Sequence, residues 1–158
     1  MPAAPERRAP ALADILLVLS ELEAHGVRYA LLGGAAMAVH GFPRMTRDID
    51  CIFPVDRRNN AKLMAALGSL GKKLRLDHVP TKQSLDQGFS TAAEGEIALD
   101  ILFVAAAHRF EDYAKHIEER EIDGVRFKVL DVDGMLMSKE TGRPQDIPDT
   151  NRLRALKA

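Results

Sequence analysis

The segment Asp48-Ile49-Asp50-Cys51-Ile52-Phe53 places the tightest constraint on this chain. Its apolar residues predict a β-strand, and alternation along a strand puts Asp48 and Asp50 on one face and Ile49 and Cys51 on the other. Two adjacent carboxylates repel each other and resist full ionisation unless a cation lies between them. We therefore expect a core on one face and a site for a hard divalent cation, Mg²⁺ or Mn²⁺, on the other.

A third acidic residue, Asp100, interrupts an apolar run over residues 96–104. Ile97, Leu99, Ile101 and Phe103 form one face of the expected strand, and Asp100 breaks the other. A lone buried carboxylate costs several kcal/mol. The simpler explanation is that Asp100 pairs with a buried arginine or lies at an exposed end of the strand. We instead expect Asp100 to lie beside the first two carboxylates, sharing a metal or accepting a proton.

Gly33-Gly34 follows an apolar strand expected over residues 27–32 and precedes a short helical stretch. Glycine allows backbone N–H groups to approach a ligand closely, and a helix N-terminus favours a phosphate. A simple turn would explain the pair equally well by itself. The dinucleotide-binding and P-loop glycine patterns are absent from the sequence.

Periodicity and breakers predict one α+β domain with a small mixed central sheet flanked by helices. We expect residues 1–10 to be a flexible or loosely docked tail and residues 11–158 to be the domain. Helices are expected over 11–25, 57–70, 109–120 and 145–156, strands over 27–32, 48–53, 73–79, 88–92 and 96–104, and a hairpin with its turn at Asp123-Gly124. Either Asp131 or Asp133 is expected to cap a short helix ending near Met137.

Composition limits the classes of partner. The net charge of −1 gives no overall attraction to nucleic acid or to a membrane surface, although the basic residues at 57–58 and 72–75 leave RNA contact open. The single cysteine excludes an intrachain disulfide, and no 18-residue apolar run predicts a membrane span. We expect a cytoplasmic protein with no membrane partner.

The segment LLGGAAMAVHGFPRMTRDIDCIF resembles the signature of the nucleotidyltransferase superfamily that includes DNA polymerase beta. Arg44 and Thr46 before the aspartates are similar to the minimal, abortive-infection-like branch and to some antibiotic-modifying enzymes. The segment EIDGVRFKVLDVDGMLMSKETGRPQD is similar to the family's hairpin, short helix ending in lysine, and Gly-Arg-x-x-Asp. Pro148 departs from that pattern, because other members more often continue an unbroken helix past that Asp.

The resemblance implies a polymerase-beta-like fold and the transfer of a nucleoside monophosphate from an NTP to an acceptor hydroxyl, on a small molecule, a protein or an RNA end. It implies catalytic and metal-binding roles for Asp48, Asp50 and Asp100, and nucleotide contacts from Gly33, Gly34, Arg44, Thr46, Lys139 and Arg143. Thr46 is also expected to hydrogen-bond Asp48. The alternative is a catalytically silent binding module with this fold, such as the antitoxin or regulatory protein partner of a toxin–antitoxin pair.

Overall fold

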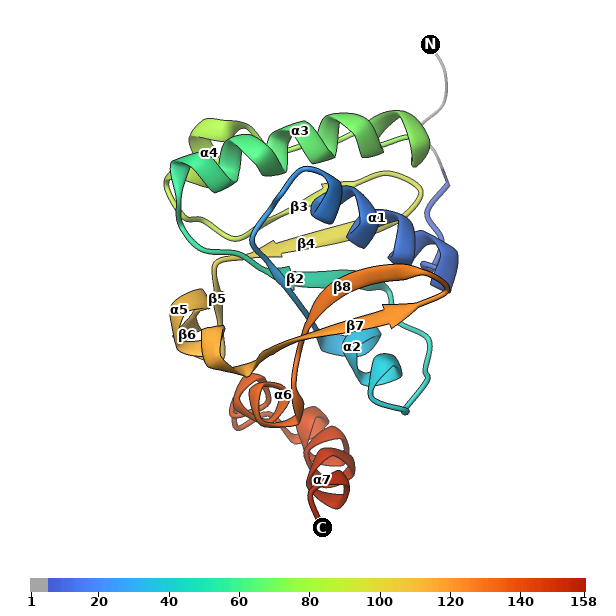
Figure 1. The fold of residues 1–158 in the computed structure, drawn as a ribbon, viewed down its shortest axis with the longest axis vertical. Coiled ribbons are helices and arrows are strands. Elements are labelled where there is room, and N and C mark those ends of the chain that lie inside the picture. The colour runs from blue at the N-terminus through green and yellow to red at the C-terminus, as the bar shows by residue number, and fades with distance from the viewer. Residues whose placement is uncertain (1–5) are drawn as a thin grey trace.

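The computed structural model describes residues 6–158, and its centre is one six-stranded mixed sheet (Figure 1). The sheet has the order β3-β4-β2-β1-β8-β7, in which β1–β8 and β2–β4 are parallel and the other pairs are antiparallel. The strands are β1 (Ala30–Leu32), β2 (Asp48–Ile52), β3 (Thr91–Glu94), β4 (Ala98–Leu102), β7 (Ile117–Ile122) and β8 (Val125–Leu130); β5 (Val104–Ala105) and β6 (His108–Arg109) form a separate pair.

Helices surround this sheet, which confirms the predicted α+β class. They are α1 (Leu12–Ala24), α2 (Gly33–Val39), α3 (Arg57–Lys73), α4 (Lys82–Asp86), α5 (Phe110–Tyr113), α6 (Val132–Ser138) and α7 (Ile147–Leu156), with 3₁₀ turns at Ala114–His116 and Pro144–Asp146. Figure 1 shows α3 and α4 at one end of the molecule, with α1 beside α3, and α6 and α7 at the other end. No helix within residues 6–158 has the length and apolar character needed to cross a membrane.

The two faces of β2 differ as the alternation predicts. Ile49 and Cys51 are fully buried in the core, together with leucines of α1 and α3 such as Leu19 and Leu67. Asp48 and Asp50 lie on the opposite face and remain partly exposed. The free energy gained by burying the apolar face holds the carboxylate face in position.

The hairpin turn at Asp123-Gly124 is confirmed, but the helix predicted over 109–120 is wrong. Only Phe110–Tyr113 and a 3₁₀ turn are helical, and Ile117–Ile122 form β7 instead. Asp123 and Gly124 both have positive φ, +51° and +80°, as a tight hairpin turn requires. The hairpin pairs six residues of β7 with β8. This pairing between strands overrides the helical preference of the Glu- and Arg-rich sequence.

The predicted helix over 57–70 is longer than expected, and the strand over 73–79 is wrong. Asp56 caps α3 by accepting a hydrogen bond from the Asn59 N–H, and the helix continues through Gly71. Packing against the core stabilises the helix as far as Lys73. Arg75 then adopts positive φ, which ends any extended run, and His78 alone bridges to Glu94.

Capping residues and the position of a proline explain the start of the remaining helices. Asp131, rather than Asp133, caps α6 by accepting from the Gly134 N–H. Pro148 lies in the first turn of α7, where its missing N–H costs nothing. The short helix α4, capped by Thr81, was not predicted.

Part of the predicted tail packs against the sheet. The Arg8 N–H donates to the Glu96 carbonyl at 2.8 Å, and the Arg8 guanidinium donates to Asp14 at 2.6 and 2.9 Å. Arg7 pairs with Glu94. Residues 1–5 lie outside the described residues, so the division into a tail over 1–10 and a domain over 11–158 stays a prediction.

Candidate active site

Three carboxylates meet on the exposed face of the sheet. Asp48, Asp50 and Asp100 each offer an oxygen, and the three oxygens lie within 4.8 Å of one another. The strand register brings them together, because Asp50 of β2 lies directly opposite Asp100 of the parallel strand β4, and Asp48 lies two residues before Asp50. The predicted cluster therefore forms from segments fifty residues apart in sequence, residues 50 and 100.

The cluster carries the electrostatic signs of a cation site. Burial and the adjacent Asp100 carboxyl raise the pKa of Asp50 to about 8. Burial and Asp100 also raise the pKa of Asp48. Within residues 6–158, no Lys or Arg nitrogen lies within 4.0 Å of any of the three carboxylates. Three oxygen donors that oppose each other's ionisation suit a hard divalent cation.

Gly33 and Gly34 pack directly against this cluster at the start of α2. Gly33 has φ of +73°, and a Cβ at this position would overlap the carboxylate of Asp50. A Cβ on Gly34 would lie 2.8 Å from Thr46 Oγ1. Side chains at these positions would displace Asp50 or Thr46, and at Gly33 the positive φ would also strain any other residue. The glycine turn thus lies beside the carboxylates, as the sequence predicts.

Thr46 supports β2 from the preceding loop. Its hydroxyl donates to the backbone carbonyl of Asp48 at 2.9 Å. The predicted contact between these residues is present, but it reaches the main chain and not the carboxylate. Thr46 therefore fixes the start of the strand and fills the space beside Gly34.

Arg44 and Lys139 are held together by Asp149, a residue of α7. The Arg44 guanidinium donates to one oxygen of Asp149 at 2.7 Å, and Lys139 Nζ lies 3.1 Å from the other. The Asp149 carboxylate is nearly fully buried, with 3% of its side chain exposed. Burial opposes its ionisation, but Lys139 and Arg44 outweigh this and lower its pKa.

Arg44 and Lys139 lie close to the glycine turn and to the carboxylates. Arg44 Nε would lie 3.5 Å from a Cβ on Gly34. The positive charge of Lys139 favours the ionised form of Asp50 and partly offsets the rise in the pKa of Asp50. The predicted grouping of Arg44 and Lys139 with the glycines and carboxylates is therefore present in space. Arg143 is different, because it is exposed and pairs with Asp146 at 3.0 Å.

Sequence reasoning missed the role of Asp149 altogether. Asp146 appeared only as part of the tail pattern, yet it receives Lys139 at 3.6 Å, Arg143, and the Thr141 hydroxyl. A signal was present: two aspartates three residues apart in a helix lie on one face, and they follow Lys139 and Arg143. The sequence could not show which cation pairs with Asp146 and which with Asp149, because that depends on how α7 packs on α6.

No protein-family model and no curated protein matches this sequence, but solved structures share its fold. The lincosamide antibiotic adenylyltransferase LnuA, solved with lincomycin, matches with a TM-score of 0.62 and 18% identity over 94% of this chain and 99% of that one. An antigenic nucleotidyltransferase-like protein of Paracoccidioides brasiliensis matches with a TM-score of 0.58 and 18% identity over 94% and 79%.

A third structure, ANT(2'')-Ia in complex with adenylyl-2''-tobramycin, matches with a TM-score of 0.55 and 18% identity over 90% of this chain and 86% of that one. At these identities the comparisons establish the fold. The chain therefore has the nucleotidyltransferase fold, as the resemblance to the polymerase-beta-type superfamily predicts.

Proposed function

We propose that this protein is a metal-dependent nucleotidyltransferase that moves a nucleoside monophosphate from an NTP to an acceptor hydroxyl and releases pyrophosphate. The observation that carries the proposal is the convergence of the Asp48, Asp50 and Asp100 oxygens within 4.8 Å, directly beside the Gly33-Gly34 turn. A triphosphate needs both features, namely backbone donors for its oxygens and ligands for the cation that neutralises it.

The carboxylates fit Mg²⁺ or Mn²⁺ by donor type, spacing and mutual repulsion. The ion would be held by Asp48, Asp50 and Asp100, and it would neutralise charge on the phosphates and on the attacking oxygen. The protein supplies the remaining functions. The glycine turn leaves room for the triphosphate, Arg44 and Lys139 add positive charge beside it, and Asp100 accepts the proton of the acceptor hydroxyl.

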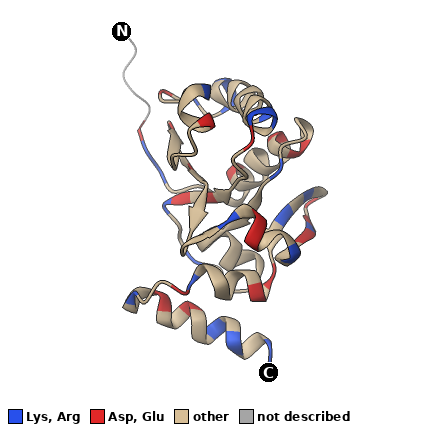
Figure 2. Cartoon of the chain, turned by 90° about the vertical axis from the view of Figure 1, so that its left-hand side faces the viewer, with Lys and Arg blue, Asp and Glu red and all other residues tan. Residues whose placement is uncertain are grey.

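The acceptor is proposed to be a small molecule. Two structures that share the fold were solved with lincomycin or with adenylyl-2''-tobramycin, which supports a small acceptor. Both basic and acidic residues are spread over the chain (Figure 2), and the net charge is −1. This distribution favours a small acceptor over a long nucleic acid.

The test is pyrophosphate release from each of the four NTPs with Mg²⁺ or Mn²⁺, in the presence of pooled small-molecule, protein or RNA acceptors. We expect Asp50→Asn and Asp100→Asn to lower the rate by about 10²–10³-fold, the scale on which lost electrostatic stabilisation acts. The matched control is Asp123→Asn, in the exposed β7–β8 turn, where positive φ suits asparagine. Turnover that survives both triad substitutions would refute the assignment.

The alternative is a catalytically silent binding module that regulates a partner protein in a toxin–antitoxin pair. All three carboxylates and both glycines are present and assembled, which favours the enzyme. Mg²⁺-dependent NTP binding without pyrophosphate release under any acceptor condition would favour the module instead.

A further inference from the structure

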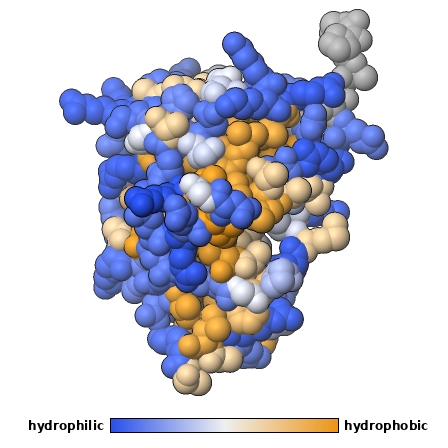
Figure 3. Space-filling view, turned by 45° about the vertical axis from the view of Figure 1, so that its right-hand side comes forward, coloured by the Kyte–Doolittle hydropathy of each residue, from blue (hydrophilic) through white to orange (hydrophobic). Residues whose placement is uncertain are grey.

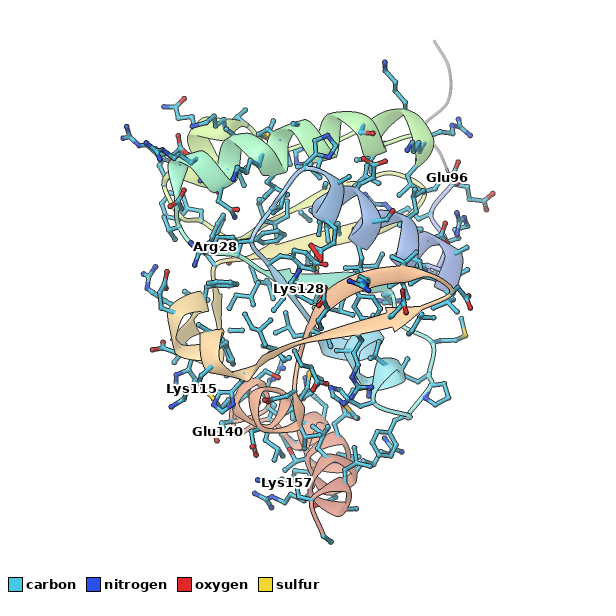
Figure 4. The ribbon with its side chains drawn as sticks, viewed as in Figure 1. Arg28, Glu96, Lys115, Lys128, Glu140 and Lys157 are labelled. Carbon is cyan, nitrogen blue, oxygen red and sulfur yellow. The ribbon has the colours of Figure 1, made fainter. Side chains whose placement is uncertain are left out.

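A groove of about 530 Å³ opens beside Asp48. Its walls come from the N-terminal segment Arg7–Ala9, from Met45 and Arg47 before β2, and from Glu96–Ala98 at the start of β4. We call this the acceptor groove. Figure 4 shows Glu96 beside the N-terminal segment, and the Arg8 contacts to Asp14 and Glu96 hold that segment in place. Its volume is within the range of small-molecule sites.

The acceptor groove lies on the side of the carboxylates away from the glycine turn. In the sheet, β2 lies between β1 and β4. Gly33 follows β1 and abuts Asp50, whereas Ala98 of β4 pairs with Asp48 and lines the groove. Phosphoryl transfer needs the attacking and leaving oxygens in line on opposite sides of the phosphorus. If the triphosphate occupies the glycine side, an acceptor in this groove approaches from the required side.

The charges of the acceptor groove single out Arg47. Arg7 is compensated by Glu94, and Arg8 by Asp14 and Glu96. Arg47 is exposed and has no ion pair within 4.0 Å among residues 6–158. Its positive charge partly offsets the rise in the pKa of Asp48 that burial and Asp100 cause. A guanidinium group is suited to bidentate binding of a carboxylate or phosphate.

Apolar surface lies beside this charge. Met45, which is 88% exposed, supplies most of it, and the nearly buried Ile97 and Ala98 line the floor of the same groove. Figure 3 shows exposed apolar side chains between hydrophilic ones on the side of the molecule that carries the N-terminal segment. Such a surface can contact the body of a small molecule whose charged group meets Arg47.

We propose that the acceptor groove selects a small hydroxylated molecule carrying a carboxylate or phosphate, which Arg47 recognises. This inference rests on the proposed nucleotidyl transfer. The acceptor oxygen forms a bond to the α-phosphorus, the bond from that phosphorus to the pyrophosphate oxygen breaks, and the hydroxyl proton passes to Asp100. The products are a nucleoside monophosphate ester and pyrophosphate. An amino sugar is disfavoured because its ammonium group would meet Arg47.

Four matched sugars test the selectivity: glucose, glucose 6-phosphate, glucuronate and glucosamine. The readout is kcat/KM for pyrophosphate release with Mg²⁺ and the preferred NTP. We expect one or both anionic sugars to exceed glucose by about tenfold, with glucosamine lowest. Arg47→Glu should abolish or reverse this order. Arg57→Glu is the control, because Arg57 is exposed at the start of α3, beyond the opposite end of β2. A preference for glucosamine, or an order unchanged in Arg47→Glu, would overturn the proposal.

Binding is measured separately from turnover by NMR of ¹³C-methyl methionine in the full-length protein, with the Met45 signal assigned by Met45→Leu. Glucose 6-phosphate or glucuronate should shift the Met45 signal in the wild type, and Arg47→Glu should weaken the apparent affinity about tenfold. No shift up to millimolar anionic sugar would refute the groove assignment. Absence of pyrophosphate release with every acceptor would instead refute the proposed function.

Discussion

At the scale of single residues, Asp50 is a carboxyl group whose ionised form destabilises the folded protein. It lies against Gly33 and opposite Asp100, and its pKa is raised to about 8 by burial and by that neighbour. A carboxyl group that prefers to be neutral destabilises the fold when it is forced to ionise. Active sites commonly retain such a cost because the charged group is needed for function.

We predict that Asp50→Asn stabilises the metal-free protein in a pH-dependent way. The folded pKa of about 8 lies above the ordinary aspartate pKa of 3.8, so the folded state binds more protons than the unfolded state between these two pH values. Wild-type stability should therefore fall as pH rises through this window. In urea unfolding, the gain from Asp50→Asn should grow from near zero at pH 4 to on the order of 5 kcal/mol at pH 8.5, at about 1.4 kcal/mol for each unit of pKa difference.

The control for this measurement is again Asp123→Asn, whose stability relative to wild type should not change with pH over the same range. Saturating Mg²⁺ should reduce the difference between wild type and Asp50→Asn. A gain that is constant from pH 4 to 8.5 would mean that Asp50 ionises as an ordinary carboxylate.

At the scale of elements, the junction of α6 and α7 matters because it brings two cations to the site. Asp149, in the first turn of α7, holds Lys139 after α6 and Arg44 from the loop before β2. Three segments far apart in sequence thus share one buried carboxylate. We infer that Asp149 is a positioning residue that acts on the nucleotide through Arg44 and Lys139.

We predict that Asp149→Asn weakens binding of the nucleotide more than it slows chemistry. Without the carboxylate, Arg44 and Lys139 repel each other and lose their fixed positions, so KM for the NTP should rise about tenfold with a smaller fall in kcat. Stability should also fall, by about 3–5 kcal/mol, because Arg44 loses its carboxylate partner and Lys139 keeps only its longer contact to Asp146. Asp133→Asn, an exposed aspartate of α6 paired with Lys157, is the matched control.

A double variant separates positioning from simple loss of stability. Lys139→Met combined with Asp149→Asn removes one of the two cations that Asp149 neutralised, so stability should partly recover, whereas the affinity for NTP should not. If affinity recovers together with stability, Asp149 has only a structural role.

At the scale of the whole molecule, nucleotide and metal should be linked to the stability of the fold. The triad joins β2 and β4, the glycine turn begins α2, and Lys139 and Arg44 connect to α7. A ligand that contacts all of these binds the folded chain and not the unfolded one. Its binding energy therefore adds to the free energy of unfolding.

We predict that Mg²⁺ together with a non-hydrolysable ATP analogue, at about 100 times Kd, stabilises the protein by about 2.7 kcal/mol. For a chain of this size the melting temperature should rise by about 5–10 °C. Mg²⁺ alone or the analogue alone should give a smaller shift, and Asp100→Asn should remove the synergy between them. Equal shifts with and without Mg²⁺ would contradict a shared metal–nucleotide site.

The sequence by itself determined the features that depend on local periodicity. Alternation along β2 fixed which face carries Asp48 and Asp50, and Asp100 stood out because it interrupted an apolar strand. Asp56 and Asp131 cap helices through hydrogen bonds to their own first turns. The motif pattern then indicated the fold and the candidate site residues, including Arg44 and Lys139.

The tertiary structure decided what depends on contacts between distant segments. Residues 117–122 became a strand because β8 offered backbone partners, against their helical composition. Gly71 lies within α3 because packing outweighs its low helix propensity. Asp149 meets Arg44 and Lys139, and Arg47 faces a groove completed by the N-terminal segment. Local sequence sets only the φ and ψ preferences and the face of each residue. Pairing and burial between distant segments determine which charges meet.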